Sequence, residues 1–439
     1  MTPHQHFGRQ VSPFLVLACL AIYLLFTLQQ VVISDWRGTG ISLGGTAIRI
    51  FVATVSVFML WRHGIPPLMR MPLLAILACL AVLAASVIAS EHPDIAIKFA
   101  VKYATGLLFL WTCLNLSLAF PSFPRAATLA ALIALWGNIL LGLGVRFALP
   151  FLKNLSLAFH PESTFKYLPR VSGIYEHPSI FGATAVLSAI LAFQLYSWGE
   201  LSKRAVQWGA AGAIVALLLT EARNNLVPLL ALGSALLWLK RDDLRTINRW
   251  AIASGLSVVL AMAGVMLWRR YAELTSAVNK ENLLTAFTLG RTYIWGGAFE
   301  AWRTHPWFGL GAGVFQFLTP DFTGGRFDRG ELHAHNVLLA ILSETGLAGL
   351  VAYVLLVYSL WAPLLRRHGG IANRTWALIW LIVLPCFGLF DFYLPFYGFS
   401  IHLALVIAYQ YASAYHRQET GVLDTIPLRL ERSRRATHG

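Results

Sequence analysis

Charged side chains are scarce in this sequence. Asp, Glu, Lys and Arg make up only 12% of the 439 residues, about half of the roughly 25% found in soluble domains. Hydrophobic residues make up 57%, and the mean hydropathy is +0.64. This balance argues against a soluble domain, a disordered chain and a disulfide scaffold. It predicts an all-α, polytopic integral membrane protein, because runs of about 20 apolar residues cross the bilayer core as helices.

Cysteines and several catalytic signatures are also few or missing. The four cysteines lie inside apolar runs and are interpreted as small core residues, not as disulfides or zinc ligands. The sequence has no Asp-x-Asp pair, no Gly-x-Ser-x-Gly elbow, and no P-loop lysine after its Gly-Leu-Gly-Ala-Gly run at 309–313. A nucleotide-sugar enzyme with a metal held by paired aspartates is therefore disfavoured. We expect neither a metal nor a cofactor in the site.

Twelve apolar runs predict membrane-spanning helices. They lie near 13–33, 42–61, 71–89, 97–118, 126–149, 179–198, 205–220, 223–239, 249–268, 337–361, 375–390 and 394–414. No cleavage site follows the first run, so we do not interpret it as a signal peptide.

The positions of the basic residues predict the orientation. The connections on the side of the N-terminus are rich in Lys and Arg, whereas the short connections on the other side carry only Arg37 and Arg223. Basic loops resist translocation, so both termini are expected in the cytoplasm. The net charge of +14 then belongs to these loops and does not indicate nucleic-acid binding. We interpret 1–439 as one transmembrane domain with a basic cytoplasmic tail, 415–439, which either lies near anionic lipid headgroups or is a solvated, disordered end.

Two long connections, 150–178 and 269–336, fall on the opposite side. Loops of this length are uncommon unless they are functional. Within 283–302 the apolar residues recur at helical spacing, and His305-Pro306 would end that helix. The second connection therefore predicts a helical cap with amphipathic helices. Its tryptophans suit the membrane interface.

Three arginines on the non-cytoplasmic side are candidate binding residues: Arg170, Arg223 and Arg291. Guanidinium groups bind phosphate oxygens in pairs, and do so well where water is scarce. Each arginine alone is better explained by snorkelling or by an ion pair, such as Arg223 with Glu221. Together they predict a site for a lipid-linked anion.

The segment Glu331-Leu-His-Ala-His-Asn336 leads into the tenth predicted span. His333 and His335 could share a metal only with a third firm ligand, which the segment lacks. Histidine titrates near neutrality, so His335 is the candidate for acid–base work. Glu331, His333 and Asn336 are candidate supporting residues. Gly346 and Gly349, three residues apart, are expected to allow close helix packing.

These motifs together resemble the O-antigen ligase family, within the wider group of O-antigen ligases and polymerases. His335-Asn336, then nine residues, then Gly346-Leu-Ala-Gly349 resembles the ligase signature. Arg223, Arg291 and Arg170 look like basic residues of the family's outer loops. The resemblance covers about 170–349 by motif and the whole chain by topology.

The resemblance implies a glycosyltransferase of the bacterial inner membrane with its site facing the periplasm. It would move O-antigen glycan from an undecaprenyl-diphosphate donor to lipid A–core. His335 would take the proton of the acceptor hydroxyl, and the three arginines would hold the diphosphate. Direct displacement would invert the anomeric configuration, with no metal required. The partners would be the donor, the acceptor and membrane lipids.

Three other functions stay open. An O-antigen polymerase has the same donor but a lipid-linked glycan as acceptor, and the His-Asn-x9-Gly-x-x-Gly match favours the ligase. A protein O-oligosaccharyltransferase often carries extra C-terminal periplasmic sequence, which is not evident here. A lipid-linked glycan transporter would predict internal repeats and broken helices near the midplane. Neither is evident in the sequence.

Overall fold

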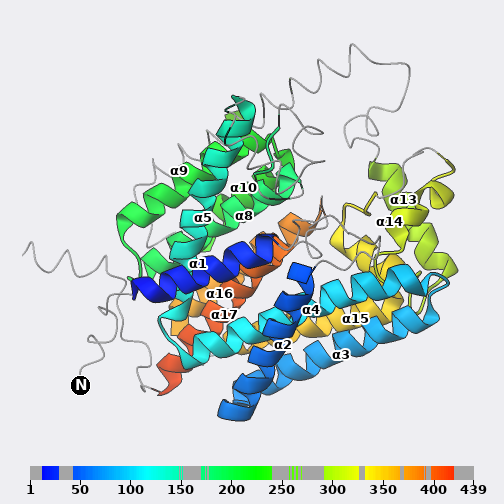
Figure 1. Cartoon of the computed structure of the whole chain (residues 1–439), viewed down its shortest axis with the longest axis horizontal. Coiled ribbons are helices and arrows are strands. Elements are labelled where there is room, and N and C mark those ends of the chain that lie inside the picture. The colour runs from blue at the N-terminus through cyan, green and yellow to red at the C-terminus, as the bar shows by residue number, and fades with distance from the viewer. Residues whose placement is uncertain are drawn as a thin grey trace, which may run out of the picture.

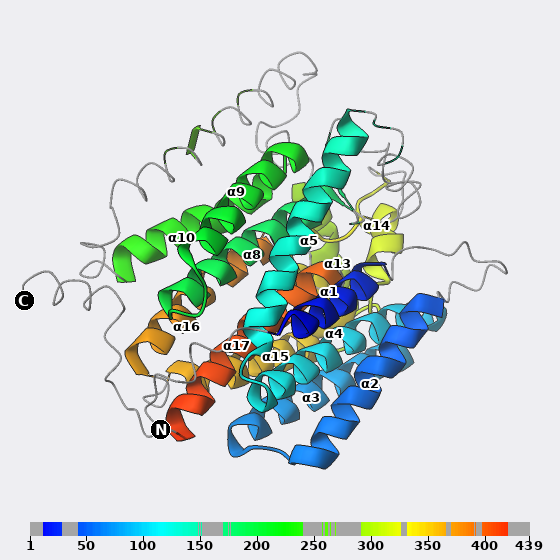
Figure 2. The ribbon, with the colours of Figure 1, turned by 60° about the vertical axis from the view of Figure 1, so that its left-hand side comes forward.

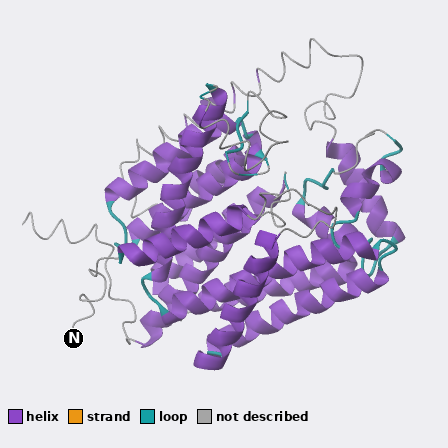
Figure 3. Ribbon diagram, viewed as in Figure 1, coloured by secondary structure: helices purple, strands orange, loops and turns teal. Residues whose placement is uncertain are grey.

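The protein is known from a computed structural model, which describes residues 12–28, 43–147, 149, 151, 170–173, 175, 177–239, 291–325, 332–365, 370–389, 391 and 397–419, with a few isolated positions between 257 and 268. Every regular element in these ranges is helical (Figure 3). The predicted all-α class is confirmed for this part of the chain.

The helices follow the predicted apolar runs closely. In chain order they are α1 (Pro13–Leu28), α2 (Leu43–His63), α3 (Pro67–Ala89), α4 (Pro93–Ala119), α5 (Phe123–Arg146), α8 (Pro178–Ser197), α9 (Lys203–Thr220), the 3-10 turn η2 (Arg223–Asn225), α10 (Leu226–Leu239), α13 (Arg291–Thr304), α14 (Phe315–Phe322), α15 (Val337–Leu365), α16 (Gly370–Leu389) and α17 (Tyr397–Glu419). Eleven of the twelve predicted runs coincide with a helix. The run 249–268 lies outside the continuously described residues.

Five of these helices are long and apolar enough to cross a membrane: α3, α4, α5, α8 and α15. The protein is therefore a multi-pass membrane protein. Crossing by all twelve predicted runs stays a prediction. Among the others, α1 and α10 are described over 16 and 14 residues, short of the roughly 20 that a span needs.

The helices form two groups joined by a central set. Figures 1 and 2 show α2, α3, α4 and α15 on one side and α5, α8, α9 and α10 on the other, with α1, α16 and α17 between them. The closest packing joins α17 to α4, α8 to α9, and α15 to α3. Large aromatic side chains fill the centre, and Trp111, Trp376, Trp380 and Tyr411 are fully buried there. The four cysteines are free thiols, as the sequence predicts.

One end of the bundle carries α13 and α14, which together with 305–314 we call the cap (Figure 1). Helix α13 ends at Thr304, just before His305-Pro306, as predicted. Ile294, Ala298 and Ala301 are buried on the inner face of α13, which packs on α15. A helical cap is thus present. The segments 152–169 and 269–290 of the two long connections lie outside the described residues.

The cap is fixed to α15 through a break in that helix. Gly346 has φ 65° and ψ −161°, which is not helical and is accessible essentially only to glycine. The chain of the cap fills the break: Leu347 N–H donates to Pro306 O at 2.8 Å and Ala348 N–H donates to Trp307 O at 3.1 Å. A Cβ at Gly346 would overlap the backbone of Trp307. The expectation that Gly346 packs against another helix was therefore wrong. Gly346 instead packs against a loop of the cap.

Candidate functional site

Four segments that are distant in the sequence meet at the cap end. They are residues 170–177 before α8, the turn 221–225 between α9 and α10, residues 332–336 before α15, and Asp391 after α16. The contacts described below join them. Each segment is a helix terminus or a short connection, so the bundle places polar residues where the apolar helices end.

The centre of the site is a pair formed by His335 and Asp391. Nδ1 of His335 lies 3.2 Å from Oδ1 of Asp391, and the two side chains are 25% and 12% exposed. The other carboxylate oxygen, Oδ2, accepts a hydrogen bond from the Asn224 side-chain amide at 3.0 Å. Asp391 therefore has two hydrogen-bond partners, the His335 ring and the Asn224 side-chain amide, which come from different segments.

Asp391 is held in its ionised form. Burial by itself raises the pKa of Asp391, but the hydrogen bond with His335 and the charges of His335, His177 and Arg291 outweigh burial and hold that pKa well below its usual range. An ionised carboxylate only accepts hydrogen bonds, so Nδ1 of His335 carries the proton. In the neutral ring the lone pair is then on Nε2, which is the arrangement that a general base needs.

Backbone conformation and a helix cap set the direction of His335. Its φ is +50°, a left-handed value that costs a non-glycine residue of order 1 kcal/mol and that gathers at functional sites. Asn336 follows, and its Oδ1 accepts from Leu338 N at 3.0 Å and Leu339 N at 3.1 Å, which caps α15. Its Nδ2 donates to Leu389 O at 3.2 Å. Asn336 thereby ties the start of α15 to the end of α16, two residues before Asp391.

Two further histidines in the cluster are neutral. Nδ1 of His177 accepts from Ser179 N at 3.1 Å and caps α8. Burial lowers the pKa of His177 to about 4, helped by Arg170, His335 and Arg291 and partly opposed by Asp391. Burial also lowers the pKa of His333 to about 4, helped most by His335 and Lys102. The cluster thus contains three imidazoles beside one carboxylate.

Cationic side chains surround this centre. Arg170 Nε donates to Thr220 O at 2.8 Å at the end of α9, so part of its guanidinium holds that helix end. Arg291 begins α13, and its charge acts on both His177 and Asp391. Lys102 of α4 acts on His333. Arg223 begins η2 directly before Asn224, and its side chain lies outside the described atoms.

The structure therefore brings together five of the seven predicted residues: Arg170, Arg291, His333, His335 and Asn336. The backbone of Arg223 lies in the same cluster, and Glu331 lies outside the described residues. Among the described residues, no three His, Cys, Asp or Glu side chains are arranged to hold a metal ion. The chemistry available is a base oriented by a carboxylate, next to positive charge that suits an anion.

Sequence reasoning missed the partners of His335. Asp391 carries the only charge in the run from Leu389 to Pro395, in a connection predicted to face away from the cytoplasm. Lys102 is a charge inside a predicted span, which is unusual enough to indicate function. Asn224 adjoins Arg223 in a short polar connection between two predicted spans. The sequence shows these three residues as polar side chains within or between apolar runs. It does not show that they lie close together, because that depends on the packing of helices far apart in the chain.

The fold and site define a multi-pass membrane protein with a basic, histidine-containing cluster at the end of its helices. Comparison with known families then identifies the class. Residues 208–354 match the family model described as O-antigen ligase, so the chain contains an O-antigen ligase family domain. Members of this family are membrane enzymes that transfer glycans, as ligases or polymerases. No curated protein matches the chain.

The match and the site overlap only in part. Arg223, Arg291 and His335 lie inside 208–354, whereas His177 and Asp391 lie outside it. The cluster is therefore completed by segments on both sides of the matched domain.

Proposed function

We propose that this protein is a lipopolysaccharide O-antigen ligase of the bacterial inner membrane. It transfers O-antigen glycan from undecaprenyl diphosphate to lipid A–core, with the cap end facing the periplasm. The observation that carries the proposal is the His335–Asp391 pair, 3.2 Å apart, with the charge of Arg291 acting on Asp391 and the charges of Arg170 and Arg291 acting on the neighbouring His177. A base and an anion site in one place are what an attack by a hydroxyl on a glycosyl diphosphate requires.

The reaction follows from these groups. Nε2 of His335 takes the proton of the acceptor hydroxyl as its oxygen bonds to the anomeric carbon of the donor sugar. The bond from that carbon to the diphosphate oxygen breaks, and its electron pair leaves with the lipid diphosphate. Attack opposite the leaving group inverts the configuration. Asp391 holds the ring in one tautomer and stabilises the imidazolium that forms.

The arginines act on the leaving group. Negative charge on the diphosphate grows as the glycosidic bond breaks, and guanidinium groups stabilise it best where water is scarce. The proposal assigns this role to Arg291, at the start of α13, and to Arg223, in the turn beside Asn224. Arg170 contributes charge while it holds the end of α9. Because the diphosphate bond is already activated and arginines supply the positive charge, the proposal includes neither metal nor nucleotide.

The test is a reaction in detergent with purified protein, lipid-diphosphate glycan and lipid A–core, in EDTA and without nucleotide. A ligase converts lipid A–core to a glycan-bearing product, and His335→Ala and Arg291→Ala lose it. The control is His305→Ala, a partly exposed cap histidine 3.8 Å from Glu91, which keeps wild-type activity. Donor converted to longer lipid-linked chains would identify a polymerase instead. Intact donor and acceptor would contradict both.

A further inference from the structure

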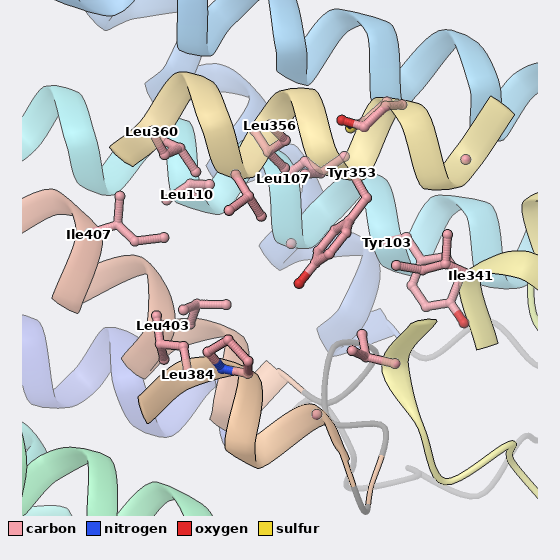
Figure 4. A pocket seen from close by; sticks show the side chains of 18 of the residues that line it. Tyr103, Leu107, Leu110, Ile341, Tyr353, Leu356, Leu360, Leu384, Leu403 and Ile407 are labelled. Atoms are coloured by element: carbon pink, nitrogen blue, oxygen red, sulfur yellow. The ribbon is translucent and has the colours of Figure 1, made fainter. Parts of the chain in front are cut away.

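An apolar cavity of about 270 Å³ lies inside the bundle, between α3, α4, α15, α16 and α17 (Figure 4). Leu107 and Leu110 of α4 face Leu384, Leu403 and Ile407 of the other helices across it. The residues that line it include no Lys, Arg or His, so its wall offers no charge to a diphosphate. The groups that bind the diphosphate of the proposed donor must therefore lie among the polar segments at the cap end.

His177 is one of these groups, and its ring is held in one orientation at the start of α8. Nδ1 accepts a hydrogen bond from Ser179 N–H at 3.1 Å, and a ring nitrogen that accepts a hydrogen bond carries no proton. The ring is neutral, so its proton is on Nε2. The residue is also partly exposed. His177 is therefore a neutral N–H donor whose direction is set by the cap of α8.

The start of α8 is joined to the His335–Asp391 pair by two successive asparagines of the turn η2. Nδ2 of Asn225 donates to Ser179 O at 2.9 Å. Nδ2 of Asn224 donates to Oδ2 of Asp391 at 3.0 Å. The same short turn therefore holds both the start of α8 and the carboxylate that orients the proposed base.

Positive charge gathers at His177 more than at the other neutral histidine. The charges of Arg170 and Arg291 both help to lower the pKa of His177. The cation that acts on His333 is instead Lys102, and neither arginine is among the groups that shift the pKa of His333. Helix α8 is 20 residues long, and its N-terminus adds positive partial charge next to His177. An anion held by the two arginines would therefore lie close to His177.

We propose that His177 is a further residue of the reaction and that its Nε2–H donates a hydrogen bond to the leaving diphosphate. The inference rests on the proposed function and adds a neutral donor to the arginines. As the bond from the anomeric carbon breaks, its electron pair stays on the diphosphate oxygen. The N–H stabilises this growing negative charge and keeps its own proton. The proton of the acceptor hydroxyl still goes to His335.

Two substitutions separate this role from the helix cap. In His177→Asn, the side-chain oxygen can take the place of Nδ1 and keep the cap, but the amide is too short to reach the position of Nε2. In His177→Gln, the amide N–H reaches the position of Nε2 and the cap is lost. The control for loss of a cap alone is Ser202→Ala at the other end of α8. Oγ of Ser202 accepts from Ala205 N at 3.3 Å and caps α9.

Glycan transfer, binding of inorganic diphosphate and thermal unfolding are measured on each purified full-length protein. His177→Asn should keep a Tm near wild type at neutral pH, bind diphosphate more weakly and transfer glycan roughly 10- to 100-fold more slowly. His177→Gln should lower the Tm, as Ser202→Ala does, and recover most of the wild-type rate and diphosphate affinity. Ser202→Ala should keep both.

A purely structural role predicts the reverse order, with an active His177→Asn and a slow His177→Gln, and that order would overturn the inference. Equal losses of rate in the two variants, at equal amounts of folded protein, would also overturn it. So would a slow His177→Asn that binds diphosphate as tightly as wild type, because His177 would then act on the His335–Asp391 pair. A wild type that transfers no glycan would instead contradict the proposed function.

Discussion

Two buried carboxylates near the cap end differ in their partners. Asp391 is held by His335 and by the Asn224 amide, within a cluster that includes Arg291 and two neutral histidines. Glu344 is 3% exposed, and its Oε2 accepts from Tyr103 O–H and from Gly313 N–H, each at 2.8 Å. The donors of Glu344 are a phenol and a backbone amide.

This difference suggests separate roles for the two carboxylates: Asp391 in the proposed reaction and Glu344 in holding the fold together. In the proposed mechanism, Asp391 orients the ring of His335, whose second nitrogen acts on the substrate. Glu344 joins α4, α15 and the cap, and Leu310 N and Gly311 N also donate to the backbone of Ser343 and Glu344 at 2.8 and 3.0 Å. We therefore expect changes around Asp391 to alter the rate of glycan transfer, and changes around Glu344 and Gly346 to alter stability.

The largest effect is expected for His335→Ala. Loss of a general base typically lowers a rate by roughly 10²- to 10⁴-fold, and the variant should keep its fold because His335 is partly exposed. Initial rates of glycan transfer and thermal unfolding are measured together. A rate within a factor of three of wild type would remove the base from the mechanism.

Asp391→Asn should have the next largest effect. The amide keeps the size of the side chain but removes the charge that fixes Nδ1–H of His335, and a hydrogen bond to a charged group contributes roughly 1.5–3 kcal/mol. That corresponds to a roughly 10- to 100-fold lower transfer rate. Donor binding should change much less than the rate. Equal losses in rate and in donor affinity would show that Asp391 acts mainly on binding.

Gly346→Ala tests whether the break in α15 stabilises the attachment of the cap. The backbone at Gly346 costs any other residue roughly 1–3 kcal/mol, and the new Cβ would also overlap the cap. The matched control is Gly324→Ala, which has a positive φ of 64° but no atom within 4 Å of the Cβ that the substitution adds. Thermal unfolding should show a clearly lower Tm for Gly346→Ala than for Gly324→Ala. Similar Tm values would mean that the break in α15 does not secure the cap.

The smallest expected effect is a pH dependence of stability at the site. The pKa of His177 is about 4 in the fold, below the roughly 6.5 of an unfolded histidine. Between these values the unfolded chain binds more protons, so stability is complete above about pH 6.5 and falls as the pH drops toward 4. His177→Asn keeps an acceptor for the cap of α8 and cannot titrate. Its Tm should fall less with acid, and an unchanged slope would contradict this explanation.

The sequence predicts helices better than it predicts contacts. The runs 71–89 and 337–361 predict α3 and α15 almost to their ends, because apolar composition and flanking prolines act locally. His335 and Arg291 could be proposed from the sequence because their motifs are local as well. Asp391 and Asn224 were not found, since their role depends on α16 and η2 converging on the start of α15. The break at Gly346 was missed because glycine in an apolar run is equally typical of helix packing.

The most direct test compares Asp391→Asn with Glu344→Gln in one glycan-transfer assay at equal amounts of folded protein. Both variants replace a buried carboxylate by an amide of the same size. Asp391→Asn should transfer glycan at roughly one tenth to one hundredth of the wild-type rate, while Glu344→Gln keeps a rate near wild type and a lower Tm. Equal loss of rate in the two variants, or a larger loss in Glu344→Gln, would contradict the assignment of the chemistry to the His335–Asp391 pair.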